Sequence, residues 1–209
     1  MPNIPNNYFT TNYPDINITG DNVILGLQTP SSQSVSGTIS NNKTWSGNVN
    51  VASTVNVADG VVLAISSGSN VVFSSGTSLT SYGKIYADNS TFTAQSGTSP
   101  NSWGSITFNG SGSAGSYITN SSILYGTRIE AINTSNINIQ GCSITNTYDG
   151  IRLSGATATI TGNTISTSSA GHGIIIEDAS TATCEQNIIT KTSSSPSGVG
   201  IICRGGSNG

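Results

Sequence analysis

Apolar residues in the second half of the chain fall into columns when the sequence is written in steps of 21 to 27 residues. The positions between them hold mainly Gly, Asn, Ser and Thr, and apolar and polar residues alternate within short segments. Alternation at period 2 predicts strands, and recurrence at a near-constant step predicts that each strand stacks on its copy in the next repeat. The three apolar columns are Ile118, Ile139, Ile160 and Cys184; Ile123, Ile144, Ile165 and Ile189; and Ile129, Ile151, Ile174 and Ile201.

A fourth column is polar and lies between two of the apolar columns. Side chains of Ser and Asn bond to the backbone in turns, and stacked amides can bond from one repeat to the next. We interpret this column as a structural turn ladder. Its members are Ser121, Cys142, Asn163 and Asn187.

The first half of the chain repeats with different residues. Val57 and Leu79 are 22 residues apart, as are Leu63 and Ile85, and a segment that begins at Trp103 joins the two halves. The pattern predicts an all-β solenoid of about seven coils of parallel strands over residues 45–209. With about 4.8 Å per coil, the solenoid is a rod on the order of 35 Å long.

Three segments resemble the right-handed parallel β-helix superfamily, which includes pectate lyases, polygalacturonases, phage tailspikes and many bacterial surface proteins. They are "INIQGCSITNTYDGIRLSG", "ATITGNTISTSSAGHGIIIED" and "TATCEQNIITKTSSSPSGVGIICRG". The resemblance covers roughly residues 45 to 209 and implies right-handed coils. It implies no single function, because this fold hosts many unrelated activities.

The two ends of the chain differ from the repeats. Residues 1–44 break the pattern, and we expect them to form an N-terminal cap on the first coil. The chain stops shortly after a Gly-Ile strand without an apolar cap. A bare solenoid end exposes unpaired backbone, so we expect the β-helix to continue or to stack beyond this point, including end-to-end self-association.

Charge and composition narrow the classes of partner. Charged residues make up 7% of the chain, against about 25% in an ordinary soluble domain. The net charge of −3 disfavours nucleic acid as a partner, and no apolar stretch is long enough to span a membrane. The low charge and the Ser, Thr and Asn content resemble secreted and cell-surface solenoids. We therefore expect an extracellular or cell-surface location, with the leader absent from this sequence.

The three cysteines cannot all pair within the chain. Cys184 shares a column with Ile160, and Cys203 shares one with Leu153 and Ile176, so both are expected to point inward. We favour buried free thiols over a Cys184–Cys203 disulfide.

A face of the Gly-Ile strands gathers the candidate functional residues, which are Glu130, Asp149, Arg152, His172, Glu177 and Arg204. One interpretation is a glycan-binding or lyase-type face, with Arg152 as the base and Asp149 or Glu177 as cation ligands, for which calcium is the cation considered. The other is a solvated face on which opposite charges neutralise one another. Glu130 and Arg152 lie in adjacent coils, about 5 Å apart at the backbone, at a suitable distance for an ion pair. We favour the second interpretation, so we assign no catalytic residue, metal ligand or cofactor.

One motif is similar to the polygalacturonase site. Gly171, His172 and Gly173 follow "NTYDGI" by one coil, where polygalacturonases carry Asn-Thr-Asp, a coil with paired aspartates and then Gly-His-Gly. Here Tyr148 replaces the third residue of the first phrase, and the paired-aspartate coil is absent. Inverting glycosidases need two carboxyl groups about 6.5–9.5 Å apart, and only Asp149 aligns near His172.

The sequence therefore predicts a structural or adhesive β-helix module that presents a weak binding face for a polysaccharide or cell-surface glycan along its Gly-Ile strands. Two alternatives stay open. One is a polysaccharide lyase or glycoside hydrolase that acts on an acidic, pectin-like polymer. The other is a self-assembling solenoid.

Overall fold

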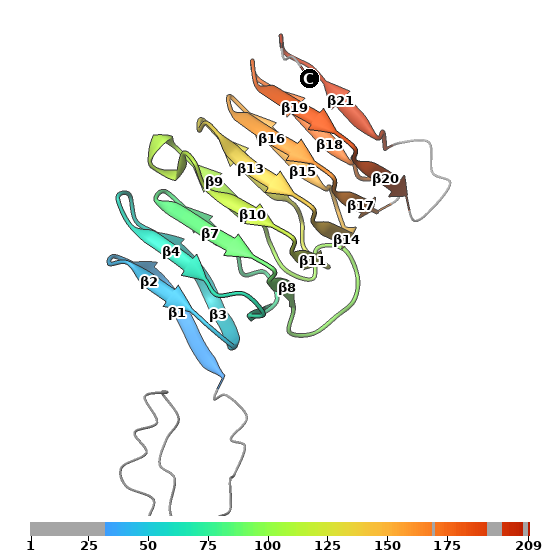
Figure 1. Ribbon diagram of the computed structural model, residues 1–209. Coiled ribbons are helices and arrows are strands. Elements are labelled where there is room, and N and C mark those ends of the chain that lie inside the picture. The colour runs from blue at the N-terminus through green and yellow to red at the C-terminus, as the bar shows by residue number, and fades with distance from the viewer. Residues whose placement is uncertain (1–31, 169, 192–197, 207–208) are drawn as a thin grey trace, which may run out of the picture. The chain divides into compact units, whose positions relative to one another are not determined.

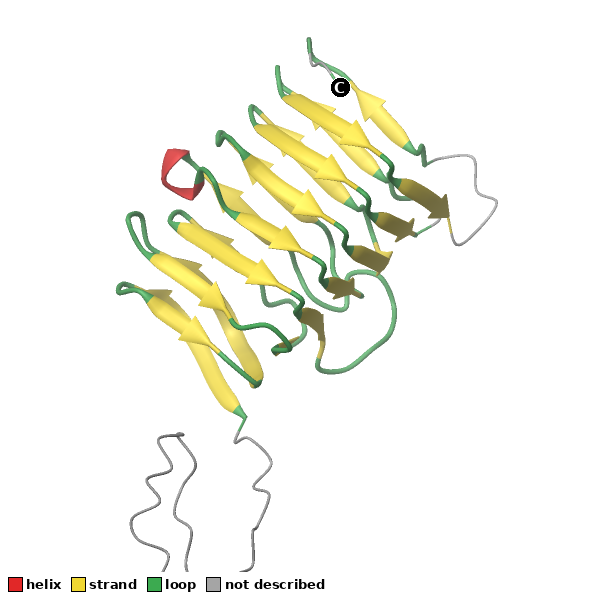
Figure 2. Ribbon diagram, in the orientation of Figure 1, coloured by secondary structure: helices red, strands yellow, loops and turns green. Residues whose placement is uncertain are grey.

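The computed structural model describes residues 32–168, 170–191, 198–206 and 209. The described chain winds through parallel strands, and strands of successive coils lie side by side (Figure 1). Figure 2 shows strands joined by turns and loops, with a single 3-10 turn, η1 (Ser111–Ser113), among the described residues. The prediction of an all-β parallel solenoid of about seven coils is confirmed.

Each complete coil contributes one strand to each of three stacks. The first stack is a separate seven-stranded sheet, and the other two are arms of a 14-stranded sheet that are joined through the long strand β3 (Asn48–Val57), on which β1 (Gln33–Ile39) also pairs. The seven-stranded sheet contains β2 (Lys43–Trp45), β4 (Val62–Ile65), β7 (Lys84–Asp88), β10 (Tyr117–Thr119), β13 (Ile137–Gln140), β16 (Thr157–Thr161) and β19 (Thr181–Glu185). The first arm contains β5 (Asn70–Phe73), β8 (Thr91–Ala94), β11 (Ser122–Leu124), β14 (Ser143–Thr147), β17 (Thr164–Thr167) and β20 (Ile188–Lys191). The second arm contains β6 (Leu79–Ser81), β9 (Ile106–Asn109), β12 (Ile129–Ile132), β15 (Ile151–Ser154), β18 (Ile174–Glu177) and β21 (Ile201–Cys203).

The apolar columns form the interior of the solenoid. Ile118 pairs with Ile139, Ile139 with Ile160, and Ile160 with Cys184. The three isoleucines are fully buried. Since every second residue of a strand points inward, one coil supplies a few aliphatic side chains from each strand and buries them against the coils on either side.

One register differs from the sequence prediction. Leu79 pairs with Val55, and Val57 pairs with Ser81, so the predicted Val57–Leu79 pair is wrong by two residues. The reason is that β3 runs around a corner and serves both arms, and its partners β5 and β6 are separated by a turn that β3 lacks. The predicted Leu63–Ile85 pair is present.

Trp103 fixes the long connection between β8 and β9. Its ring stacks on Phe73 with centroids 4.1 Å apart and planes 9° apart, and its Nε1–H donates to the Leu124 carbonyl at 2.7 Å. A Cβ at Gly126 would lie 2.7 Å from the Trp103 ring, so glycine is required there for the ring to fit. The Trp-led segment thereby joins the early and later coils.

Regular pairing begins before the predicted start of the solenoid at residue 45. β1 pairs with β3, and β2 pairs with β4, so residues 33–39 and 43–45 already belong to the strand stacks. Residues 1–31 of the predicted cap lie outside the described residues, and the capping role stays a prediction. Within the described part, no helix is long and apolar enough to cross a membrane.

Candidate functional site

The six candidate residues lie along the second arm of the 14-stranded sheet and at the turns that precede its strands. Glu130, Arg152 and Glu177 belong to β12, β15 and β18, and Arg204 follows β21. Asp149 and His172 precede β15 and β18. The structure divides the six into two groups of charges in contact.

The first group is a continuous chain of ion pairs, which we call the ionic column: Glu130, Arg152, Glu177 and Arg204. Arg152 Nη1 donates to Glu130 Oε1 at 2.5 Å, and Arg152 Nε donates to Glu177 Oε1 at 2.6 Å. The other oxygen of Glu177 accepts from Arg204 Nε and Nη2, both at 2.6 Å. The ionic column therefore ties four successive coils together through alternating charges.

The contacts within the ionic column favour the charged forms of Arg152 and Glu177. Burial alone would lower the pKa of Arg152, but hydrogen bonds and charge from Glu130 and Glu177 raise it above its ordinary value. Burial alone would raise the pKa of Glu177, whose side chain is 7% exposed, but hydrogen bonds from Arg204 and Arg152 hold it below its ordinary value. An arginine with a raised pKa and two carboxylate partners is a poor general base.

The second group centres on Asp149, whose side chain is 4% exposed. Its Oδ2 lies 3.2 Å from Arg128 Nη1, and its Oδ1 accepts the backbone N–H of His172 at 2.9 Å. The His172 Nδ1 lies 3.6 Å from the same oxygen. Adjacent coils thus bring an aspartate, a histidine and an arginine together, as the alignment of Asp149 with His172 predicted in part.

This arrangement limits the available chemistry. Asp149 is nearly buried and already accepts from two groups, and Glu177 accepts from two arginines. The described residues contain no group of three or more His, Cys, Asp or Glu side chains that could hold a metal ion. The basic side chains of the candidate set that reach solvent are Arg204, at 57% exposure, and Arg152 and His172, at lower exposure.

Two features of this face were not predicted. Arg128 was not among the candidates, although its position directly before Ile129 of the Gly-Ile column placed it near Asp149. Ile175 occupies an outward position between Arg152 and Ile202 in register, yet it is only 4% exposed. Period-2 alternation indicates on which side of a strand a residue lies, but not how exposed its side chain is.

The turn ladder lies between the seven-stranded sheet and the first arm. Asn163 Oδ1 accepts the Cys142 backbone N–H at 2.9 Å, and its Nδ2 donates to the Ile139 carbonyl at 2.9 Å and to Asn187 Oδ1 at 2.9 Å. Asn187 repeats the pattern one coil later, and Ser121 Oγ accepts the Ser90 N–H at 3.0 Å. Each side chain therefore satisfies buried backbone groups of the coil before it.

The three cysteines are free, but they are not equally buried. Cys142 is buried, Cys184 is half-buried, and Cys203 is exposed. The expectation that Cys203 is buried is wrong, because no further described coil covers the inward side of β21.

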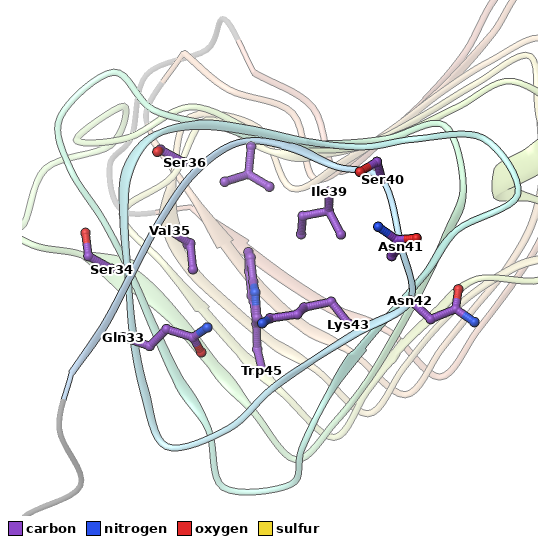
Figure 3. A pocket seen from close by; sticks show the side chains of 11 residues that line it. Gln33, Ser34, Val35, Ser36, Ile39, Ser40, Asn41, Asn42, Lys43 and Trp45 are labelled. Carbon is purple, nitrogen blue, oxygen red and sulfur yellow. The ribbon is translucent and has the colours of Figure 1, made fainter.

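An open cavity of about 590 Å³ lies at the N-terminal end of the strand stacks, away from the six candidates. Val35, Ile39 and Trp45 point into it from the first coil (Figure 3). The buried Nε1–H of Trp45 has no hydrogen-bond partner among the described residues. Lys43 occupies the inward position in register with Leu63 and also lines the cavity.

The comparisons with known proteins agree with this geometry on the fold. Residues 35–209 match the family described as "Right handed beta helix region". The chain therefore belongs to the right-handed β-helix family, which confirms the resemblance and gives the hand of the coils. Neither the curated proteins nor the solved structures include a match to the chain.

Proposed function

We propose that this chain is a rigid structural or adhesive β-helix module of a secreted or cell-surface protein, and that its Gly-Ile face binds a polysaccharide or cell-surface glycan. The observation that carries the proposal is the ionic column. Its two glutamates and two arginines are ion-paired with one another. The face therefore supplies a stable, hydrogen-bonding surface rather than free acids and bases. A catalytic site needs groups that can exchange protons near neutral pH.

The glycan contact is assigned to the exposed ends of the same residues. Arg204 is the most exposed of the ion-paired arginines. His172 belongs to the coil that follows Asp149, and it contacts the Asp149 carboxylate. An exposed, planar guanidinium can contribute hydrogen bonds to sugar hydroxyls or to a carboxylate. No resident cofactor is required for such binding, although a bridging calcium ion would be compatible with an acidic glycan.

The alternative is a polysaccharide lyase or hydrolase. One observation favours it, namely the contact between Asp149 and His172 in adjacent coils, with Arg128 on the other side of the carboxylate. Perturbed or clustered charges occur at catalytic sites and also in structural networks. The alternative therefore needs its own measurement.

A screen against acidic and neutral polysaccharides, with and without calcium, separates the two functions. Both binding and the appearance of new reducing or unsaturated ends are measured. We expect binding without cleavage, and a loss of binding in Arg204→Gln. Glu185→Gln, which alters an exposed carboxylate on β19, is the matched control. Cleavage that disappears in Asp149→Ala or Arg152→Ala variants that are still folded would overturn the proposal.

End-to-end self-association is a further proposal. Its support is the last described coil, where Ile188, Val199 and Ile201 are 62%, 45% and 49% exposed. Exposed apolar side chains beside an unpaired strand edge favour association with another strand.

A further inference from the structure

The outward face of the seven-stranded sheet carries two tyrosines in adjacent coils. Tyr86 of β7 pairs in register with Tyr117 of β10. Their rings stack with centroids 4.9 Å apart and planes 13° apart, and both residues are half-buried. The same outward column continues with Thr44 and Ala64 on one side and with Asn138, Thr159 and Thr183 on the other.

Tyr86 has an aromatic neighbour on one side of its column and a small neighbour on the other. Tyr86 lies between Ala64 and Tyr117 in its column, and Tyr117 covers one face of its ring. On the other side the neighbour in register is Ala64, which carries only a methyl group. Neither tyrosine hydroxyl hydrogen-bonds to another described residue. The surface thus combines an apolar ring face with two polar groups that are free to bond.

A cation lies beside the tyrosines. Lys84 is two residues before Tyr86 on the same side of β7, and its ammonium is 4.0 Å from the position that a Cβ would take at Gly115. Unlike the three arginines of the Gly-Ile face, it has no carboxylate within ion-pair distance in the described part of the chain. The nearby Asp88 is engaged elsewhere, since its Oδ1 accepts from Thr119 Oγ1 at 2.7 Å and Asn120 Nδ2 at 2.8 Å.

From this arrangement we infer that Tyr86, Tyr117 and Lys84 form a binding site for a glycan that carries an anionic group, a carboxylate or a sulfate, beside a pyranose ring. A pyranose ring has an apolar face of C–H groups and a rim of hydroxyls. Aromatic side chains with a polar end suit such amphipathic ligands, and the unpaired ammonium selects the anion. The inference rests on the adhesive role proposed above, but it places the contact on a different face.

Three oligosaccharides of equal length test the site by isothermal titration calorimetry: a sulfated one from heparin, an oligogalacturonate, and a neutral β-1,4-linked glucose oligomer. We expect at least one anionic probe to bind more tightly than the neutral one. Tyr86→Ala should weaken binding of that probe by about tenfold, because it removes one of the two stacked rings. Lys84→Gln should weaken binding of the anionic probe by about threefold and leave that of the neutral probe unchanged.

Tyr82→Ala is the matched control, because Tyr82 is an exposed tyrosine in a turn outside this column. Tyr86→Phe keeps the ring and should retain most of the affinity, while thermal denaturation of each variant checks that it is folded. Binding that is unaffected by Tyr86→Ala but lost in Arg204→Gln would overturn this site and keep the Gly-Ile face. Absence of binding to every glycan in both screens would overturn this site and the adhesive role together.

Discussion

Cys142, Cys184 and Cys203 differ in exposure although each follows a column of the repeat. Burial raises the pKa of the Cys142 thiol to about 11, and burial, followed by the nearby Cys203, raises the pKa of Cys184. The thiolate is the reactive form. A buried thiol with a raised pKa is therefore unreactive for two reasons. Reagents cannot reach it, and at neutral pH it is protonated.

These differences predict the order in which the thiols react. At pH 8, a disulfide reagent such as Ellman's should modify Cys203 rapidly, Cys184 more slowly, and Cys142 only after denaturation. Cys203→Ser should remove the fast phase and leave the total in denaturant lower by one thiol per chain. A native fast phase that persists in Cys203→Ser and disappears in Cys142→Ser would contradict the buried position of Cys142.

Between strands, the turn ladder bonds each coil to the coil before it. A residue in the left-handed region precedes each ladder member, as with Asn120 at φ 48° and Gly162 at φ 64°. The left-handed residue bends the chain from the seven-stranded sheet into the first arm, and the next side chain bonds to the backbone of the preceding coil. Asn and Gly tolerate this conformation better than other residues, which is why the turns of this chain are rich in both.

Substitution of Asn163 tests the ladder. Asn163→Ala removes three hydrogen bonds of its side chain and leaves the Cys142 N–H and the Ile139 carbonyl buried without that partner. We expect a loss of about 2–4 kcal/mol in the free energy of unfolding. Asn163→Ser should recover part of this loss, because the Ser121 hydroxyl accepts the equivalent N–H of Ser90. Equal stability of the wild type and the alanine variant in urea unfolding would show that the ladder contributes little.

The strands also show which features of the fold and of the candidate site could be predicted from the sequence. Columns such as Ile129, Ile151 and Ile174 were predictable because a constant step and strict alternation describe stacked strands fully. The Val57–Leu79 error arose where β3 turns a corner within one continuous strand, which no residue pattern marks. At the candidate site, the register of the repeats was sufficient to predict that Glu130 lies next to Arg152. It could not show that Glu177 and Arg204 extend the same chain of ion pairs, because side-chain direction is decided by packing.

Across the whole solenoid, the ionic column is the only described chain of ion pairs that spans four coils. Surface ion pairs contribute little when both partners are solvated, but the Glu177 side chain is 7% exposed and accepts from two arginines. Its pKa lies below the ordinary value of 4.5 in the folded protein. Because the folded pKa is depressed, this stabilisation is fully present above the unfolded pKa and is lost as the pH falls through the folded value.

This linkage predicts that the melting temperature is nearly constant from neutral pH down to about pH 5 and then falls as the solution becomes more acidic. Glu177→Gln should lower stability at pH 7 by about 2 kcal/mol, because two arginines lose a charged acceptor. It should also flatten the acid branch of the pH profile, since the titrating group is gone. Glu185→Gln, which changes an exposed carboxylate on β19, should leave both quantities unchanged. Calorimetric scans from pH 3 to pH 8 measure both effects. If the acid branch of Glu177→Gln matches that of the wild type, the coils are held together by their apolar interior and turn ladder alone, and the ionic column follows from the stacking without stabilising it.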